Sequence, residues 1–216
     1  MTWDAPAVAA ACEPVPGSAA SVFGAALPTA VTYAGILATR GVEQGLIGPH
    51  EVPRLWGRHL LNCAVVAELI EPRPVTLLDL GSGAGLPGLV LAMVLPGTAV
   101  TLLEPMERRC RFLSGCVAEL GLANASVLRG RAEDATLRAD VATARAVAPL
   151  DRLAELAVRV VRPGGLVLAI KGQTADAELR KARPVLRRIG ARGAKVVRAG
   201  QGKVDPATTV VRFFAT

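Results

Sequence analysis

The sequence predicts an α/β fold in which a mostly parallel, doubly wound sheet carries helices on both faces. From residue 75 onward, short apolar runs typical of buried strands alternate with helical segments, and this alternation produces parallel sheets covered on both sides. A glycine-rich run directly follows the first of these strands. With 216 residues and 51% hydrophobic content, the chain can form one compact domain with a sizeable core.

The segment before the alternating region differs from it in composition. Residues 1–20 are rich in Ala, Pro and Ser, so we expect a flexible N-terminal segment there. Two or three helices are expected up to residue 70, broken at Pro28, between Gly45 and Pro49, and at Pro53. We therefore divide the chain into a flexible segment (1–20), a helical extension packed on the core (21–72) and a core (73–216), all within one globular domain.

The core itself should contain seven strands. The first five are expected at residues 75–80, 99–104, 125–129, 140–145 and 165–171, with helices at 87–95, 106–120, 149–162 and 174–189. Two final strands, 194–199 and 207–214, flank a turn at Gly200-Gln201-Gly202 and predict a terminal hairpin that adds an antiparallel member to the sheet.

The glycine-rich run reads Asp79-Leu80-Gly81-Ser82-Gly83-Ala84-Gly85-Leu86. Glycine allows positive φ values and leaves no Cβ between the backbone and a ligand. Residues 83–88 match the G-x-G-x-x-G fingerprint of dinucleotide-binding domains, in which a pyrophosphate rests on a helix N-terminus. Pro87 would remove one of the donors required there. The acid two residues before three alternating glycines instead favours the D-x-G-x-G-x-G loop of S-adenosylmethionine (AdoMet) enzymes.

Acidic residues after the next two strands support an adenosine-type ligand. Glu104 ends the second strand, about twenty residues after the glycine loop, where a carboxylate can accept both ribose hydroxyls. Ala132, Glu133 and Asp134 follow the third strand, where an acid or a backbone amide can meet an adenine edge. NAD enzymes share the ribose acid, but acids after three successive strands fit AdoMet better. Capping of a short helix is the alternative for Glu133 and Asp134, and it is the favoured interpretation of Asp134 alone.

Charge and cysteine usage indicate the partner and the compartment. The net charge of +7 and pI near 9.9 favour a polyanionic partner such as nucleic acid. Only seven aromatic residues are present, so recognition should depend on backbone charge and shape more than on base stacking. The four cysteines form no C-x-x-C pair, which predicts reduced thiols in a cytoplasmic protein without zinc or disulfides. Prolines and a glycine interrupt the most apolar stretch, residues 86–103, so no membrane span is expected.

Several segments, taken in order and spacing, resemble the bacterial small-subunit (16S) ribosomal RNA guanine-N7 methyltransferases, also called the glucose-inhibited division protein B family. The resemblance implies the class I AdoMet-dependent methyltransferase fold, AdoMet as methyl donor, and 16S rRNA or the 30S subunit as substrate. We expect the enzyme to be a monomer. It covers about two thirds of the chain. The segments are Arg58-His59, Asp79 to Gly88, Arg108-Arg109-Cys110-Arg111-Phe112-Leu113, Gly130 to Asp134, Ala144 to Leu150, and Leu168 to Gly172.

Residue roles follow from the resemblance where the motifs match. It implies that Gly81 and Leu86 line the AdoMet pocket, that Ala132 and Glu133 lie at the adenine, and that Arg145 closes the site. Two stretches depart from the family pattern: Thr39-Arg40-Gly41 replaces an Asn-Leu-Thr motif, and Asn62-Cys63 replaces an Asp-Ser pair. The complete expected cofactor set is Asp79, Gly81, Gly83, Gly85, Leu86, Glu104, Ala132, Glu133 and Arg145.

The expected chemistry needs positioning more than proton transfer. Guanine N7 carries an in-plane lone pair and no proton, so its methylation requires alignment but no general base. The sequence offers no Cys-His or Ser-His-Asp constellation. Arg145 and Lys171 end predicted strands and face the cofactor crevice, so we expect them to be catalytic, with one donor to guanine O6. Pairing of Arg145 with Glu133, and a solvated strand end for Lys171, are the alternatives.

Basic residues outside the crevice are candidates for contact with RNA. Arg108, Arg109 and Arg111 open the helix after Glu104, where positive charge is unfavourable unless an anion or a nearby acid offsets it. Arg58 and His59 lie on one predicted helix, and we hypothesise that both also contact RNA. Three other functions remain open: a nicotinamide-dependent oxidoreductase, a methyltransferase for a small molecule or protein, and a ribosome-binding factor without activity.

Overall fold

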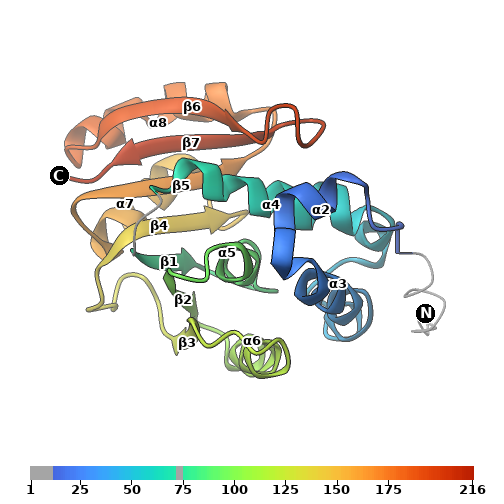
Figure 1. Cartoon of the computed structure of the whole chain (residues 1–216). Coiled ribbons are helices and arrows are strands. Elements are labelled where there is room, and N and C mark those ends of the chain that lie inside the picture. Colours follow the sequence, from blue (N-terminus) through green and yellow to red (C-terminus); the bar gives the residue numbers. More distant parts are fainter. Residues whose placement is uncertain (1–11, 72–74) are drawn as a thin grey trace.

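The computed structural model describes residues 12–71 and 75–216. A seven-stranded sheet crosses it in the order β3-β2-β1-β4-β5-β7-β6 (Figure 1). The first five strands pair in parallel, and β7 runs antiparallel between β5 and β6. The strands are β1 (Thr76–Leu80), β2 (Ala99–Glu104), β3 (Ala125–Arg129), β4 (Ala139–Arg145), β5 (Val161–Lys171), β6 (Arg192–Ala199) and β7 (Thr208–Phe214).

The sheet separates two apolar cores. Leu77 and Leu78 are neighbours in β1, and because side chains alternate along a strand they contribute to opposite faces. The Leu77 side holds α5 (Gly88–Val94), α6 (Glu107–Glu119) and the N-terminal helices, whereas the Leu78 side holds α7 (Leu150–Val160) and α8 (Ala175–Arg188). The predicted doubly wound, mostly parallel sheet with an antiparallel terminal hairpin is confirmed.

Short helical elements build the N-terminal extension beside α5 (Figure 1). Phe23 and Trp56 join its two halves through an edge-to-face contact, with ring centroids 6.0 Å apart. The elements are α2 (Ser18–Phe23), η1 (Gly24–Ala26), α3 (Leu27–Ile36), η2 (Leu37–Gly41), η3 (Pro49–Arg54), η4 (Leu55–Leu61), α4 (Asn62–Ala64) and η5 (Val65–Leu69).

The largest differences from the expected elements occur at three places. The flexible segment predicted for residues 1–20 falls partly on residues 1–11, which lie outside the described part of the chain, but α2 already begins at Ser18 and Ala19 is fully buried. Strand β5 begins at Val161, earlier than expected, because pairing with β4 starts before a register shift near Asp140. A turn replaces the short helix considered at Asp134, whose N–H donates to the Arg131 carbonyl over 3.1 Å.

One stretch, Ser18–Gly41, is long and apolar enough by length and composition to cross a membrane. Core helices of soluble proteins pass the same test, and this stretch contributes Ala30, Tyr33 and Leu37, each with no exposed surface, to the core. Tyr33 also donates its hydroxyl to the carbonyl of Ala84 in the glycine loop, over 2.6 Å. These contacts fit a helix that supports the loop.

Candidate functional site

The glycine loop turns sharply from β1 toward α5. Gly81 and Gly83 adopt φ values of 64° and 58°, which strongly favour glycine. The N–H groups of Gly81 and Ser82 both donate to the Leu103 carbonyl, at 2.8 and 3.2 Å, so the loop is tied to the end of β2. A Cβ added at Gly83 would meet only the Gly81 carbonyl, 3.8 Å away. The backbone of the loop is therefore open to a ligand at this position.

Asp79 is buried beneath the glycine loop and stabilises it through hydrogen bonds. Its carboxylate accepts hydrogen bonds from the Gly88 N–H (3.1 Å) and the Thr143 hydroxyl (3.2 Å). Burial raises the pKa of this carboxyl to about 7, while the hydrogen bonds act in the opposite direction. Because Asp79 has no exposed surface, it positions the loop and the start of α5 and cannot contact a ligand directly. A Cβ at Gly88 would lie 2.6 Å from Asp79 Oδ2, so only glycine permits this approach.

These contacts decide between the two ligands considered for the loop. A pyrophosphate needs free N–H groups at the helix N-terminus. At the start of α5, Pro87 has no N–H, Gly88 donates to Asp79 and Leu89 donates to the Gly85 carbonyl over 2.8 Å. The start of α5 therefore lacks the donors that a dinucleotide requires, and the loop fits AdoMet.

Glu104 joins the glycine loop to the segment after β2. Its carboxylate accepts from the N–H groups of Gly83 and Met106, each over 3.0 Å. A carboxylate has about four acceptor positions, so two remain for ribose hydroxyls. Glu104 is only 1% exposed, and Arg109 Nη1 lies 3.9 Å from its Oε2. Contact with a ribose therefore requires neighbouring side chains such as Arg109 to move.

A cavity of about 240 Å³ lies over the glycine loop, and we call it the cofactor cavity. The buried Nε of Arg109 has no hydrogen-bond partner among the described residues. Arg109 lines this cofactor cavity. Arg108 and Arg111 instead line a separate groove together with Arg40 and Gln44. The cavity is lined by Leu46, Ile47, His59, Gly81, Ser82, Gly83, Ala84, Leu86, Arg109, Arg145 and Ala146.

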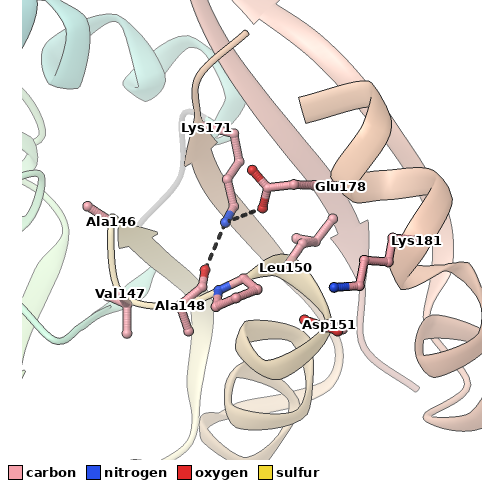
Figure 2. Close-up of a pocket in the computed structure, with 9 residues that line it drawn as sticks. Ala146, Val147, Ala148, Leu150, Asp151, Lys171, Glu178 and Lys181 are labelled. Atoms are coloured by element: carbon pink, nitrogen blue, oxygen red, sulfur yellow. Dashed lines mark hydrogen bonds and ion pairs between the residues drawn. The ribbon is translucent and has the colours of Figure 1, made fainter. Parts of the chain in front are cut away.

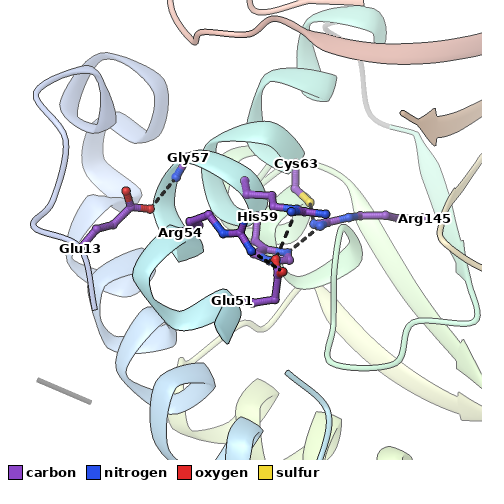
Figure 3. A network of polar contacts seen from close by, with 8 residues as sticks. Glu13, Glu51, Arg54, Gly57, His59, Cys63 and Arg145 are labelled. Atoms are coloured by element: carbon purple, nitrogen blue, oxygen red, sulfur yellow. Dashed lines mark hydrogen bonds and ion pairs between the residues drawn. The ribbon is translucent and has the colours of Figure 1, made fainter. Parts of the chain in front are cut away.

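Arg145 leaves the end of β4 and meets the N-terminal extension (Figure 3). Its guanidinium donates to His59 Nδ1 over 2.5 Å and to the Cys63 sulfur over 3.3 Å. The other ring nitrogen, His59 Nε2, is 2.8 Å from Glu51 Oε2. Burial first, and then the charge of Arg145, lower the pKa of His59 to about 4, so the ring is neutral. His59 therefore donates to Glu51 and accepts from Arg145.

The partners of Arg145 leave its charge unbalanced. Among the described residues no carboxylate lies within ion-pair distance of it, and the alternative partner Glu133 instead pairs with Arg152 over 2.8 Å. Arg145 is half-buried. A half-buried cation held by neutral groups favours an anion nearby.

Arg58 and His59 occupy different positions on η4. Arg58 is exposed and its Nε lies 3.3 Å from Glu51 Oε2. His59 is 7% exposed and lies in the wall of the cofactor cavity. The hypothesis that both contact RNA is thus supported by exposure for Arg58 alone, while the position of His59 favours an indirect role through Arg145.

Lys171 ends β5 but is not a solvated strand end (Figure 2). Its Nζ donates to the Ala148 carbonyl over 2.9 Å and pairs with Glu178 over 2.8 Å. Burial alone would raise the pKa of Glu178, but the hydrogen bond and charge of Lys171 outweigh it and lower the pKa. Lys171 therefore braces the segment after β4 against α8. A cavity of about 450 Å³ lies beside this ion pair.

The other residues expected to bind the cofactor, Gly85, Ala132 and Glu133, do not line the 240 Å³ cavity. Ala132 and Glu133 form a turn after β3, and Gly130 N donates to the Glu104 carbonyl over 3.2 Å. Gly85 faces inward, since an added Cβ would meet Leu89 and Tyr33. The lining residues Leu46 and Ile47 were not expected, because nothing in an apolar loop signals its distance from the glycines.

The strand order, the open glycine loop and the acid at the end of β2 define a class I AdoMet-dependent methyltransferase. Two solved structures share the fold. A putative S-adenosyl-L-methionine-dependent methyltransferase from Methanococcus maripaludis matches with a TM-score of 0.58 and 13% identity, over 85% of this chain and 93% of that one. A ribosomal protein L11 methylase from Lactobacillus delbrueckii matches with a TM-score of 0.56 and 15% identity, over 72% and 77%.

Sequence comparison gives the family. Residues 26–204 match the family model described as GidB: rRNA small subunit methyltransferase G. A protein from Thermobifida fusca named ribosomal RNA small subunit methyltransferase G is 58% identical over 205 residues, or 94% of this chain and 86% of the relative. One of the same name from Streptomyces avermitilis is 52% identical, over 94% and 87%. The chain belongs to the GidB family, and it is an AdoMet-dependent methyltransferase.

Proposed function

We propose that this protein transfers a methyl group from AdoMet to N7 of a guanine in 16S ribosomal RNA. The observation that carries the proposal is the position of Arg145, a half-buried cation with neutral partners, directly beside the open glycine loop. The names of the relatives support the RNA substrate. The guanine N7 atom is what the family resemblance implies, and a site that offers no free general base agrees with it.

The residues of the site suit a reaction that needs no base. AdoMet supplies an electrophilic methyl group on a sulfonium. The N7 lone pair forms the new C–N bond as the C–S bond breaks, the bonding pair stays on sulfur, and the positive charge passes to the guanine. His59 is neutral and both its ring nitrogens are engaged, so it is not free to take a proton. The chain contributes alignment and electrostatics.

The partner should be bound largely through its phosphates. Arg40, Arg108 and Arg111 line a groove of about 350 Å³ on the α6 side of the molecule. Arg111 pairs with Glu107 over 3.0 Å, which offsets part of the positive charge at the start of α6. We propose that the groove contacts 16S rRNA or the 30S subunit, that the enzyme acts as a cytoplasmic monomer, and that it needs neither a metal nor a membrane.

Identification of the labelled product tests the proposal. Purified protein is incubated with tritiated AdoMet and either 30S subunits or naked 16S rRNA, the RNA is digested, and the labelled nucleoside is identified. Labelled 7-methylguanosine is the expected product. A different labelled nucleoside, label on protein, or no transfer with folded, AdoMet-binding protein would overturn the proposal.

A further inference from the structure

A further cavity, of about 410 Å³, adjoins the cofactor cavity, because Arg145 and Ala146 line both. Its size is within the range of about 300–1,000 Å³ that is usual for ligand pockets. We call it the nucleotide pocket. It is lined among others by Arg58, Asn62, Arg145, Ala146, Lys171 and Glu178.

We propose that the nucleotide pocket receives the target guanine as a single nucleotide turned out of the RNA, and that Asn62 binds the Watson–Crick edge of its base. The proposal rests on the proposed function. An enzyme that modifies a base takes it out of its stack and reads it inside a pocket. The structure contributes three observations: a shared wall, an excess of positive charge, and an amide without a partner.

The shared wall favours this pocket over the larger one. The nucleotide pocket and the cofactor cavity have both Arg145 and Ala146 in common. The 450 Å³ cavity shares only Ala146 with the cofactor cavity, although Lys171 and Glu178 line both it and the nucleotide pocket. Ala146 has a φ of 55°, a conformation that non-glycine residues rarely adopt and that often marks a functional site. A base in the nucleotide pocket would therefore lie against two residues that also line the cofactor cavity.

The charges around the pocket suit a nucleotide. Lys171 and Glu178 neutralise each other. Arg58 shares the Glu51 carboxylate with Arg54, so one acid serves two guanidiniums. Arg145 has no acidic partner within the described residues. The pocket therefore carries excess positive charge, which suits the phosphates next to a turned-out base.

Asn62 provides the contact that would orient the base. Its backbone carbonyl accepts from the Thr208 hydroxyl over 2.9 Å, but its side-chain amide has no hydrogen bond in the described part of the chain. Guanine presents O6 as acceptor and N1–H as donor side by side, and a carboxamide can donate to the first and accept from the second. Such a pair leaves N7 uncovered and able to reach the methyl group.

Kinetics of Asn62→Ala test the assignment. A two-point contact to a base is worth about 1–3 kcal/mol, so kcat/KM for rRNA should fall about 5- to 150-fold. The Kd for AdoMet, measured by calorimetry, should stay within about twofold of wild type, because Asn62 does not line the cofactor cavity. The truncation leaves no side chain without its partner, so folding should be preserved, which thermal unfolding checks. Lys181→Ala, in a residue that lines only the 450 Å³ cavity, is the matched control and should change kcat/KM less than Asn62→Ala.

Crosslinking gives an independent measurement. Rebuilt 30S subunits that carry 6-thioguanosine at the methylated position place sulfur where O6 would be, and irradiation with wild-type enzyme should attach the RNA to the peptide that contains Asn62. Unchanged kcat/KM in Asn62→Ala, a larger loss in Lys181→Ala, or attachment to residues 147–151 would overturn the pocket assignment while the methyltransferase proposal stands. Absence of rRNA methylation by the wild-type enzyme would instead overturn the proposed function, and the pocket assignment with it.

Discussion

Two buried ionisable residues hold the site together, and their protonation differs from what exposure to water would give. His59 stays neutral because burial and Arg145 disfavour its cation. Asp79 holds a proton up to about neutral pH because its carboxyl has no exposed surface. Both residues act on their neighbours: the first orients Arg145, and the second fixes the start of α5.

Asp79 makes stability depend on pH in a direction that is unusual for an acid. Its pKa rises from 3.8 to about 7 on folding, so between these values the folded state binds a proton that the unfolded state does not. The contribution to stability is therefore complete below pH 3.8, declines as the pH rises and is lost above about 7; the part lost between pH 5 and pH 8 is about 2–3 kcal/mol. Asp79→Asn removes this titration. The free energy of unfolding of wild type minus that of Asp79→Asn, from urea unfolding, should fall by that amount between pH 5 and pH 8.

The comparison with Asp79→Asn cancels the titration of His59. The pKa of His59 is lowered on folding, so its contribution to stability rises with pH between about 4 and 6.5, opposite to that of Asp79, but it is present in both proteins. A difference that stays constant from pH 5 to pH 8 would contradict the raised pKa of Asp79.

At the scale of elements, one lysine connects the ends of β4, β5 and α8. Lys171 binds the Ala148 carbonyl and Glu178, and Thr174 donates to the other oxygen of Glu178 over 3.1 Å. This brace fixes the segment that follows Arg145. We expect Lys171→Met to lower kcat for methyl transfer by about tenfold through misplacement of Arg145, since small displacements of positioned groups are costly. The Kd for AdoMet should change less.

A double-mutant cycle separates the brace from a catalytic role of Lys171. If Lys171 acts through Glu178, the losses in Lys171→Met and Glu178→Gln are not additive, and the double variant resembles Lys171→Met alone. Fully additive losses would show that Lys171 acts independently of Glu178, as a donor to the guanine would.

Helix α6 directs its arginines to two different places. Arg109 lines the cofactor cavity, and its buried Nε has no hydrogen-bond partner among the described residues, whereas Arg108 and Arg111 line the 350 Å³ groove. Arg109→Ala should therefore weaken AdoMet binding by about tenfold, the value of one hydrogen bond from a charged group. Arg108→Ala should weaken rRNA binding and leave the AdoMet Kd unchanged. Calorimetry with AdoMet and filter binding with rRNA measure the two effects. If Arg109→Ala weakened rRNA binding and left the AdoMet Kd unchanged, Arg109 would be an RNA-binding residue, as the sequence predicts.

At the scale of the whole molecule, the fold could be predicted from the sequence because its signals are local. Apolar runs of strand length, helical periodicity and glycines at turns place all seven strands, with only β5 beginning notably earlier than expected. The antiparallel hairpin follows from the turn at Gly200 and Gly202, both of which have positive φ values.

The site was only partly predictable, because its key contacts join distant segments. The glycine loop and Glu104 carry local motifs. The hydrogen bond from Tyr33 to Ala84 spans 51 residues, and Arg145 to His59 spans 86. No periodicity reports such pairings, so the neutral partners of Arg145 and the indirect position of Asp79 could be found only in three dimensions.

The net charge of +7 and the shortage of aromatic residues lead to a prediction for the whole enzyme. If binding depends on phosphate contacts, the logarithm of the rRNA association constant should fall linearly with the logarithm of salt concentration, with a slope of about −0.7 per phosphate contacted. Removing Arg108 and Arg111 together should make that slope shallower by about 1.4.

The A-form major groove hides guanine N7 in paired stems, so a plain RNA duplex should be bound with similar salt dependence yet methylated poorly. Filter binding between 50 and 300 mM KCl, with tritium transfer measured on the same RNAs, checks both expectations. Efficient methylation of a duplex would show that the enzyme opens paired RNA itself, and a salt-independent affinity would contradict recognition through phosphates.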